Sequence, residues 1–152
     1  MKVYCEHGAV SKSLRDLRRK GYVELVHFPY DPNSRSTRLS TPDAPSAAQL
    51  LDLNLPICEL PATLKDYTGS EHLSDILEIL GQQNRRDALH VDTAVKNGCS
   101  AFVTCDNDIL AQKVRLETTL GIRFFHPEND RDELDRFFRG DCAGSHTGHR
   151  AP

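Results

Sequence analysis

The sequence predicts an α/β fold, a three-layer α/β/α sandwich around a mainly parallel sheet of about five strands. Two observations lead to this prediction. Short apolar segments rich in β-branched residues recur near positions 3, 25, 58, 102 and 123. Segments with helical periodicity separate them, and strands joined through helices run parallel in one sheet.

The first half of the chain alternates in this way up to a long polar segment. Ser11 can cap a helix and Gly21 follows as its stop. The predicted elements are a strand over Lys2–Cys5, a helix over Ser11–Lys20, a strand over Val23–Phe28, a polar loop over Asn33–Ser46, a short helix over Ala47–Leu53 and a short strand over Ile57–Leu60.

The second half has stronger periodicity. Its predicted elements are a helix over Ser70–Leu80 capped by Ser70, a helix from Asp87 to Asn97-Gly98, a strand over Ala101–Thr104, one helix after Asp108 through Leu120, a strand over Ile122–Phe125 and a helix over Asp132–Phe138. Val114 is among the apolar positions of the helix that ends at Leu120. Residues 1–139 are predicted to form one domain, and residues 140–152, which lack apolar periodicity, a disordered tail.

Composition narrows the class of protein. With 152 residues, 38% of them hydrophobic and 27% charged, the chain suits one globular domain. It has no apolar run of the roughly 20 residues that a membrane helix needs, and no signal peptide is recognisable, so no membrane association and a cytoplasmic location are expected. The net charge of −3 gives no overall attraction to nucleic acid. The five cysteines form no C-x-x-C pair, which argues against a zinc site.

The stretch from Arg85 to Asp108 organises the rest of the chain. It is predicted to form a helix, a turn and a buried strand, with an acidic residue at each end. Asp87 opens the helix at the head of a core-facing stripe, and Asp106 follows the strand directly. Ligands of open parallel sheets bind beyond the carboxyl ends of the strands. The position of Asp106 therefore predicts a functional site there.

The same stretch resembles a known family. The pattern D-A-L-H-x-x-x-A-x-x-x-G over Asp87–Gly98, followed by F-V-T-x-D-x-D over Phe102–Asp108, is similar to the carboxy-terminal half of PIN domains. These are metal-dependent ribonucleases that include toxins of prokaryotic toxin–antitoxin pairs. The resemblance implies that the first and fourth strands are neighbours, and that Glu6 stands where the family carries its first metal-binding Asp. The family's helix Glu has no clear match, and Asp31 is the nearest candidate.

Carboxylates gathered in this way repel one another unless a cation compensates, and Mg²⁺ or Mn²⁺ accepts carboxylate oxygen. The predicted catalytic residues and principal metal ligands are Glu6, Asp87 and Asp106, with Asp108 and Asp31 as further ligands. The residues predicted to contact or orient substrate are Arg85, Arg86, Thr104 and Arg35. Asp87 and Asp106 are also natural helix caps, which is the structural alternative to a metal site.

The resemblance implies a divalent-metal-dependent endoribonuclease with RNA as its partner, and it leaves an antitoxin partner and a homodimer open. The alternative is a PIN-like module that no longer cuts and binds RNA or a protein. A cationic patch over Arg15–Lys20 is either a solvated helix face or a phosphate contact. Cys5 and Cys105 each precede an acidic residue at a strand end, so alternation along the strands predicts that both thiols are buried.

Overall fold

The computed structural model describes residues 1–6, 8–26 and 69–140. Several sequence predictions lie outside these residues. They are Asp31, Arg35, the last two residues of the strand over Val23–Phe28, the polar loop over Asn33–Ser46, the short helix over Ala47–Leu53, the short strand over Ile57–Leu60 and the tail beyond Gly140.

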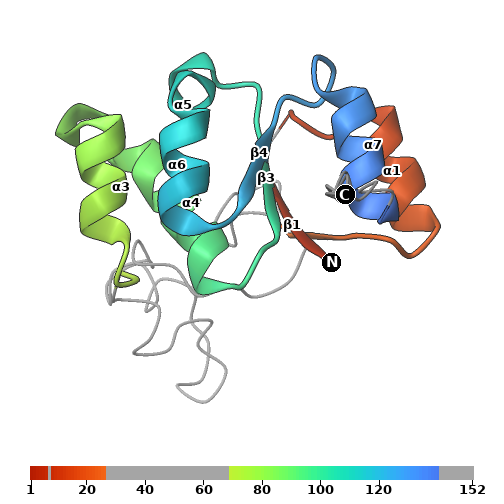
Figure 1. Cartoon of the computed structure of the whole chain (residues 1–152), viewed down its shortest axis with the longest axis horizontal. Helices are drawn as coiled ribbons and strands as arrows, with labels where there is room; N and C mark the ends of the chain where they lie inside the picture. Colours follow the sequence, from red (N-terminus) through yellow and green to blue (C-terminus); the bar gives the residue numbers. More distant parts are fainter. Residues whose placement is uncertain (7, 27–68, 141–152) are drawn as a thin grey trace, which may run out of the picture.

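The described residues form an all-parallel sheet of four strands flanked by helices on both faces (Figure 1). The strand order is β2-β1-β3-β4. The strands are β1 (Lys2–Cys5), β2 (Glu24–Val26), β3 (Ala101–Val103) and β4 (Arg123–Phe125). The helices are α1 (Lys12–Arg19), α3 (Leu73–Leu80), the 3₁₀ turn η3 (Gln82–Asn84), α4 (Arg85–Lys96), α5 (Asn107–Ala111), α6 (Lys113–Leu120) and α7 (Arg131–Arg139). The predicted α/β class and the pairing of the first strand with the strand at Ala101 are confirmed.

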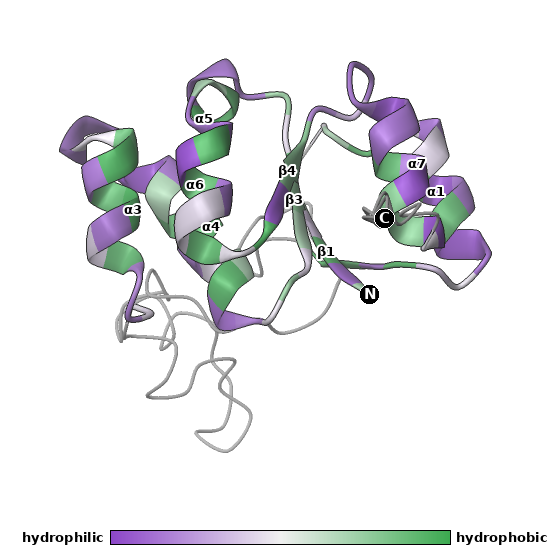
Figure 2. Ribbon diagram, viewed as in Figure 1, coloured by the Kyte–Doolittle hydropathy of each residue, from purple (hydrophilic) through white to green (hydrophobic). Residues whose placement is uncertain are grey.

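Side-chain alternation along the strands separates two cores. Tyr4, Phe102 and Phe124 share one register level, and their rings form a row on the face covered by α3, α4 and α6. The rings of Tyr4 and Phe102 stack at 5.0 Å between centroids. Val3, Cys5 and their neighbours on the opposite face pack under α1 and α7. In Figure 2 the helices carry both hydrophilic and hydrophobic residues, as expected when one side of each is buried.

Several predicted boundaries shift. The helix predicted from Ser70 begins at Leu73, because the Ser70 side chain accepts from the His72 backbone N–H at 3.1 Å and forms a turn ahead of the helix. The single helix predicted through Leu120 is two helices that meet at Gln112, whose ψ of 9° departs from helical geometry. Val114, which the prediction places among the apolar positions of this helix, is 75% exposed. No helix in the described part of the chain is long and apolar enough to cross a membrane.

Candidate functional site

The candidate site lies where β1 and β3 end. Pairing continues for one residue beyond each strand: the Glu6 N–H donates to the Val103 carbonyl and the Thr104 N–H to the Phe125 carbonyl, both at 3.1 Å. Because Cys5 pairs with Val103, this continuation brings Glu6 beside Thr104. Both follow the aromatic-row residues by two positions, so alternation turns them toward the face that α4 covers.

Thr104 links the two strand ends. It is fully buried, and its hydroxyl donates to the Glu6 carboxylate while accepting from the Asp106 backbone N–H at 2.8 Å. Asp106 in turn caps α5, since its carboxylate oxygen accepts from the backbone N–H of Asp108 at 2.8 Å. Asp106 therefore has the helix-capping role that was the structural alternative to a metal site, and one of its carboxylate oxygens makes the cap.

Asp87 comes to this edge on α4. The prediction that Asp87 opens the helix is wrong: α4 begins at Arg85, and Asp87 is its third residue, in the first turn. The helix starts early because η3 leads directly into it. An acidic residue in the first turn is favoured by the helix dipole. Since α4 leads through a short turn into β3 and covers the sheet, its first turn faces the edge where β3 ends.

The electrostatics tie the three acids together. Burial raises the pKa of the Glu6 carboxyl most, and the charges of Asp106 and Asp87 raise it further, while the hydrogen bond from Thr104 opposes the rise. Burial also raises the pKa of Asp87, with added contributions from Asp106 and Asp108. The carboxylates therefore lie within reach of one another's fields, at one edge of the sheet.

Cations partly offset this charge. The charge of Arg86 lowers the pKa of both Glu6 and Asp87, so it acts on the site electrostatically. Arg85 precedes it on the same exposed helix start. Asp108 is exposed, and its negative charge raises the pKa of Asp87. The predicted contributions of Asp31 and Arg35 fall on residues that the structure does not describe.

The acids do not form a ready-made cage for a metal ion. Within residues 1–6, 8–26 and 69–140, no group of three or more His, Cys, Asp or Glu side chains is placed to hold one ion. Mg²⁺ keeps several of its waters and is commonly held through one or two carboxylates and substrate phosphates. The gathered acids, of which Glu6 and Asp87 have a raised pKa, fit such a hydrated ion, and they do not fit an ion held by protein ligands alone.

The sequence did not reveal two contacts that hold α4 in place. The Tyr4 hydroxyl and Nδ1 of His90 are 2.7 Å apart, which joins the sheet to the middle of the helix. The buried carboxylate of Asp92 accepts from the backbone N–H of Ser70 at 3.2 Å and also binds its hydroxyl. The only sequence signal for the first contact is a histidine at i+3 from Asp87 in the resemblance pattern, and the second has none.

The prediction that both strand-end thiols are buried is wrong for Cys105. Cys5 is fully buried and Cys105 is exposed. Alternation stops applying after Thr104, because the chain leaves the sheet there and turns at Asp106 to begin α5. The residue that stands buried opposite Glu6 is Thr104.

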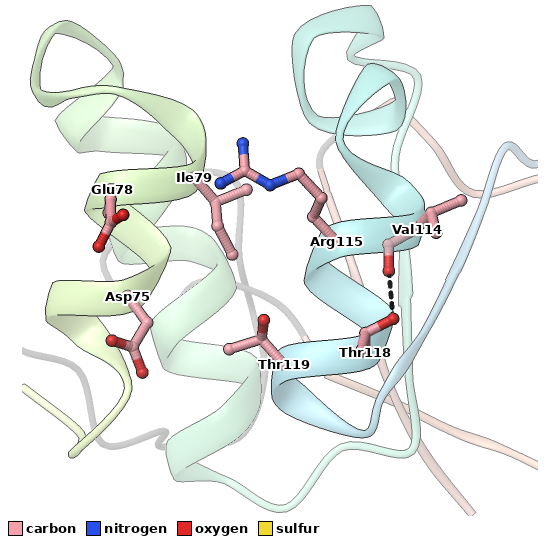
Figure 3. A pocket seen from close by; sticks show the side chains of 7 residues that line it. All are labelled: Asp75, Glu78, Ile79, Val114, Arg115, Thr118 and Thr119. Atoms are coloured by element: carbon pink, nitrogen blue, oxygen red, sulfur yellow. Dashed lines mark hydrogen bonds between the residues drawn. The ribbon is translucent and has the colours of Figure 1, made fainter.

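A separate groove lies between α3 and α6 (Figure 3). Its lining residues are Asp75, Glu78, Ile79, Val114, Arg115, Thr118 and Thr119. The Thr118 hydroxyl donates to the Val114 carbonyl at 2.8 Å, and the Val114 side chain is exposed at the rim. None of the acids of the candidate site lines this groove.

Comparisons of the chain with family models, with curated proteins and with solved structures find no significant match. The likeness to PIN domains therefore stays a prediction.

Proposed function

We propose that this protein is a divalent-metal-dependent endoribonuclease with a PIN-like α/β/α sandwich. The observation that carries the proposal is the gathering of Glu6, Asp87 and Asp106, three acids from distant parts of the chain, at a single sheet edge. There the charge of Asp106 raises the pKa of both Glu6 and Asp87, and the charge of Asp87 also raises the pKa of Glu6. Holding like charges together is unfavourable unless a cation joins them. A site of this kind is therefore built to receive positive charge.

Each residue has a role in the proposal. Asp106 and Glu6 offer their uncommitted carboxylate oxygens to a hydrated Mg²⁺ or Mn²⁺, and Asp87 closes the site from α4. Such an ion, when bound, lowers the pKa of a water and stabilises negative charge on a phosphodiester. Thr104 fixes the orientation of Glu6 and the backbone at Asp106. Arg85 and Arg86, exposed at the start of α4, contact substrate phosphates.

The test is cleavage of a mixed single-stranded RNA pool with Mg²⁺ or Mn²⁺. Asp106→Asn removes charge and keeps the cap of α5, since Asn caps a helix as well as Asp does. It should abolish cleavage while leaving thermal unfolding nearly unchanged. Asp132→Asn, an exposed acid in the first turn of α7, serves as the control and should cut like wild type. Equal cutting by wild type and Asp106→Asn would reject the proposal.

A second candidate is a PIN-like module that binds RNA or a protein without cutting. It is favoured by the hydrogen bonds that the acids already make, since Glu6 accepts from Thr104 and Asp106 caps α5. It is also favoured by the lack of a three-ligand group in the described residues. Purified protein that binds RNA and cuts none with either ion would decide for this candidate.

A further inference from the structure

The outer side of α1 carries an unusual concentration of positive charge. Within ten residues from its cap Ser11, the helix has one acid, Asp16, and five cations, in a chain whose net charge is −3. We define the α1 cationic face by these five exposed residues: Lys12, Arg15, Arg18, Arg19 and Lys20.

Helix stability does not account for this charge. Arg18 and Arg19 in the last turn complement the helix dipole, but Lys12 stands in the first turn, where a cation is disfavoured. Arg15 lies three residues after Lys12 and four before Arg19, and like charges at these spacings repel. Lys12, Arg15 and Arg19 project within about 60° of one another around the helix axis.

The protein itself neutralises little of the face. Among the described residues, Arg19 is the one member of the face that pairs with a carboxylate, at 3.1 Å from Asp16. Arg15 donates to the Val10 carbonyl at 3.4 Å and keeps its charge exposed. The helix α7 beside it adds no excess of acid, since its three acids are matched by three arginines. Its Asp135 also binds Ser13 and Arg139.

The residues of the α1 cationic face and its surroundings favour single-stranded nucleic acid over a lipid bilayer as the negatively charged partner. The buried side of α1 consists of Ser13, Leu14 and Leu17, and its exposed side carries no large apolar residue, so nothing in it inserts into a bilayer. Tyr22 follows the helix in its closing turn, where its N–H bonds the Leu17 carbonyl at 3.0 Å. Its side chain is 42% exposed. Cations that track a backbone beside an exposed ring are the combination that binds single-stranded nucleic acid.

We infer that the α1 cationic face and Tyr22 form a docking surface for single-stranded nucleic acid, with phosphates on the face and a base on the ring. The choice of RNA over DNA rests on the proposed function. The surface lies on the α1–α7 layer, whereas Asp87 comes from the opposite layer (Figure 1).

The test is fluorescence anisotropy with a labelled single-stranded oligouridylate in EDTA, so that cleavage plays no part. Lys12→Gln/Arg15→Gln/Arg18→Gln removes three charges that pair with no carboxylate. It should weaken binding at least tenfold and lower the slope of log K against log salt by about 2. Tyr22→Ala should weaken binding about tenfold, and Tyr22→Phe should bind like wild type because stacking is kept.

A matched pair separates position from net charge. Arg18→Gln and Arg115→Gln each remove one exposed arginine, from α1 and from α6. Only Arg18→Gln should weaken binding, and unchanged melting temperatures would show that each variant folds. Equal affinity of the triple variant and wild type would overturn the inference, as would equal losses in this pair. Sedimentation with phosphatidylserine vesicles without binding to the oligouridylate would overturn it in favour of a membrane surface.

The two proposals fail separately. If the oligouridylate binds with the expected salt dependence and no metal supports cutting, the ribonuclease proposal falls and the docking surface stands. If the wild type cuts RNA and the triple variant binds as tightly, the docking surface falls alone.

Discussion

The Thr104 hydroxyl donates to the Glu6 carboxylate across 98 positions of sequence. The same oxygen accepts from the Asp106 N–H, so one buried side chain fixes acids that follow two neighbouring strands. Burial of Thr104 excludes water as a substitute partner, and the geometry of the site therefore depends on this hydroxyl.

The first prediction concerns that hydroxyl. Thr104→Val keeps the shape of the side chain but removes the donor to Glu6 and the acceptor for Asp106. It should lower the free energy of unfolding by about 1–3 kcal/mol. It should also raise the pKa of Glu6 further, because the lost hydrogen bond favoured the charged carboxylate. Urea unfolding and an NMR titration of Glu6 measure the two effects. Thr104→Ser is the control, and a Thr104→Val protein with an unshifted Glu6 pKa would contradict the link.

The second prediction concerns pH. The folded protein raises the pKa of Glu6 above the ordinary 4.5, so the proton binds more tightly to the folded than to the unfolded state. The stability that this proton contributes is complete below pH 4.5 and is lost as pH rises through the folded pKa. Glu6→Gln, which does not titrate there, should therefore gain stability relative to wild type between about pH 4 and pH 7.

Urea unfolding at both pH values in EDTA measures this gain. Glu78→Gln, at an exposed position on α3, is the control for removing one acid. Its stability relative to wild type should change less with pH than that of Glu6→Gln. A constant difference between Glu6→Gln and wild type across the range would show that Glu6 ionises normally in the folded protein.

Much of the sheet was predictable because period-two burial and helical periodicity are local. The strand over Lys2–Cys5 was predicted at its observed bounds. The stop of α4 was also predicted, since Gly98 adopts a φ of +65° that glycine tolerates. The pairing of the first strand with the strand over Ala101–Val103 was predicted from the resemblance alone, because local sequence does not encode the order of strands in a sheet.

The predictions for Cys105 and Val114 were wrong because each residue lies just beyond the point where a strand or helix ends. Cys105 was assigned by alternation, which holds only while the backbone stays in the ladder, and the chain leaves it after Thr104. Val114 was placed among the apolar positions by helical periodicity, which does not carry across the break between α5 and α6 at Gln112. The Glu6–Thr104 link was out of reach, because sequence spacing does not encode a contact between chain segments so far apart.

The third prediction concerns the thiols. Burial raises the pKa of Cys5 and of Cys99 to about 12, so both stay protonated at neutral pH. Of the three described cysteines, Cys105 should react first with iodoacetamide in the folded protein, because it is exposed. Peptide mass mapping over time, with urea-unfolded protein as the control, measures each site. Labelling of Cys5 as fast as Cys105 would show that the end of β1 opens to solvent.

The fourth prediction concerns β4, the outermost strand next to β3 in the described part of the sheet. The Glu117 carboxylate accepts from the backbone N–H of buried Phe124 at 2.9 Å, and from Nε of Arg123 at 3.1 Å. Glu117→Ala should lower the free energy of unfolding by about 1–3 kcal/mol, because the Phe124 N–H loses its acceptor. Glu117→Gln keeps an acceptor and should cost less. Glu133→Ala breaks only ion pairs, the half-exposed one with Arg123 and a longer one with Lys113 at 3.8 Å, and should change little. Equal losses in all three, by urea unfolding, would assign the effect to the ion pairs.

The last prediction separates metal binding from activity. Mn²⁺ stabilises a protein whose folded form binds it, so the melting temperature of wild type should rise with Mn²⁺ at neutral pH. The rise should shrink as pH falls toward the raised pKa values of Glu6 and Asp87, because protons compete for the same carboxylates. Asp87→Asn should abolish the rise and, without metal, should melt no lower than wild type, since one repulsion disappears. Asp132→Asn, exposed on α7, should keep the full rise. A rise of equal size in Asp87→Asn would mean that Mn²⁺ binds elsewhere. No rise in wild type at any pH would mean that these acids do not bind Mn²⁺.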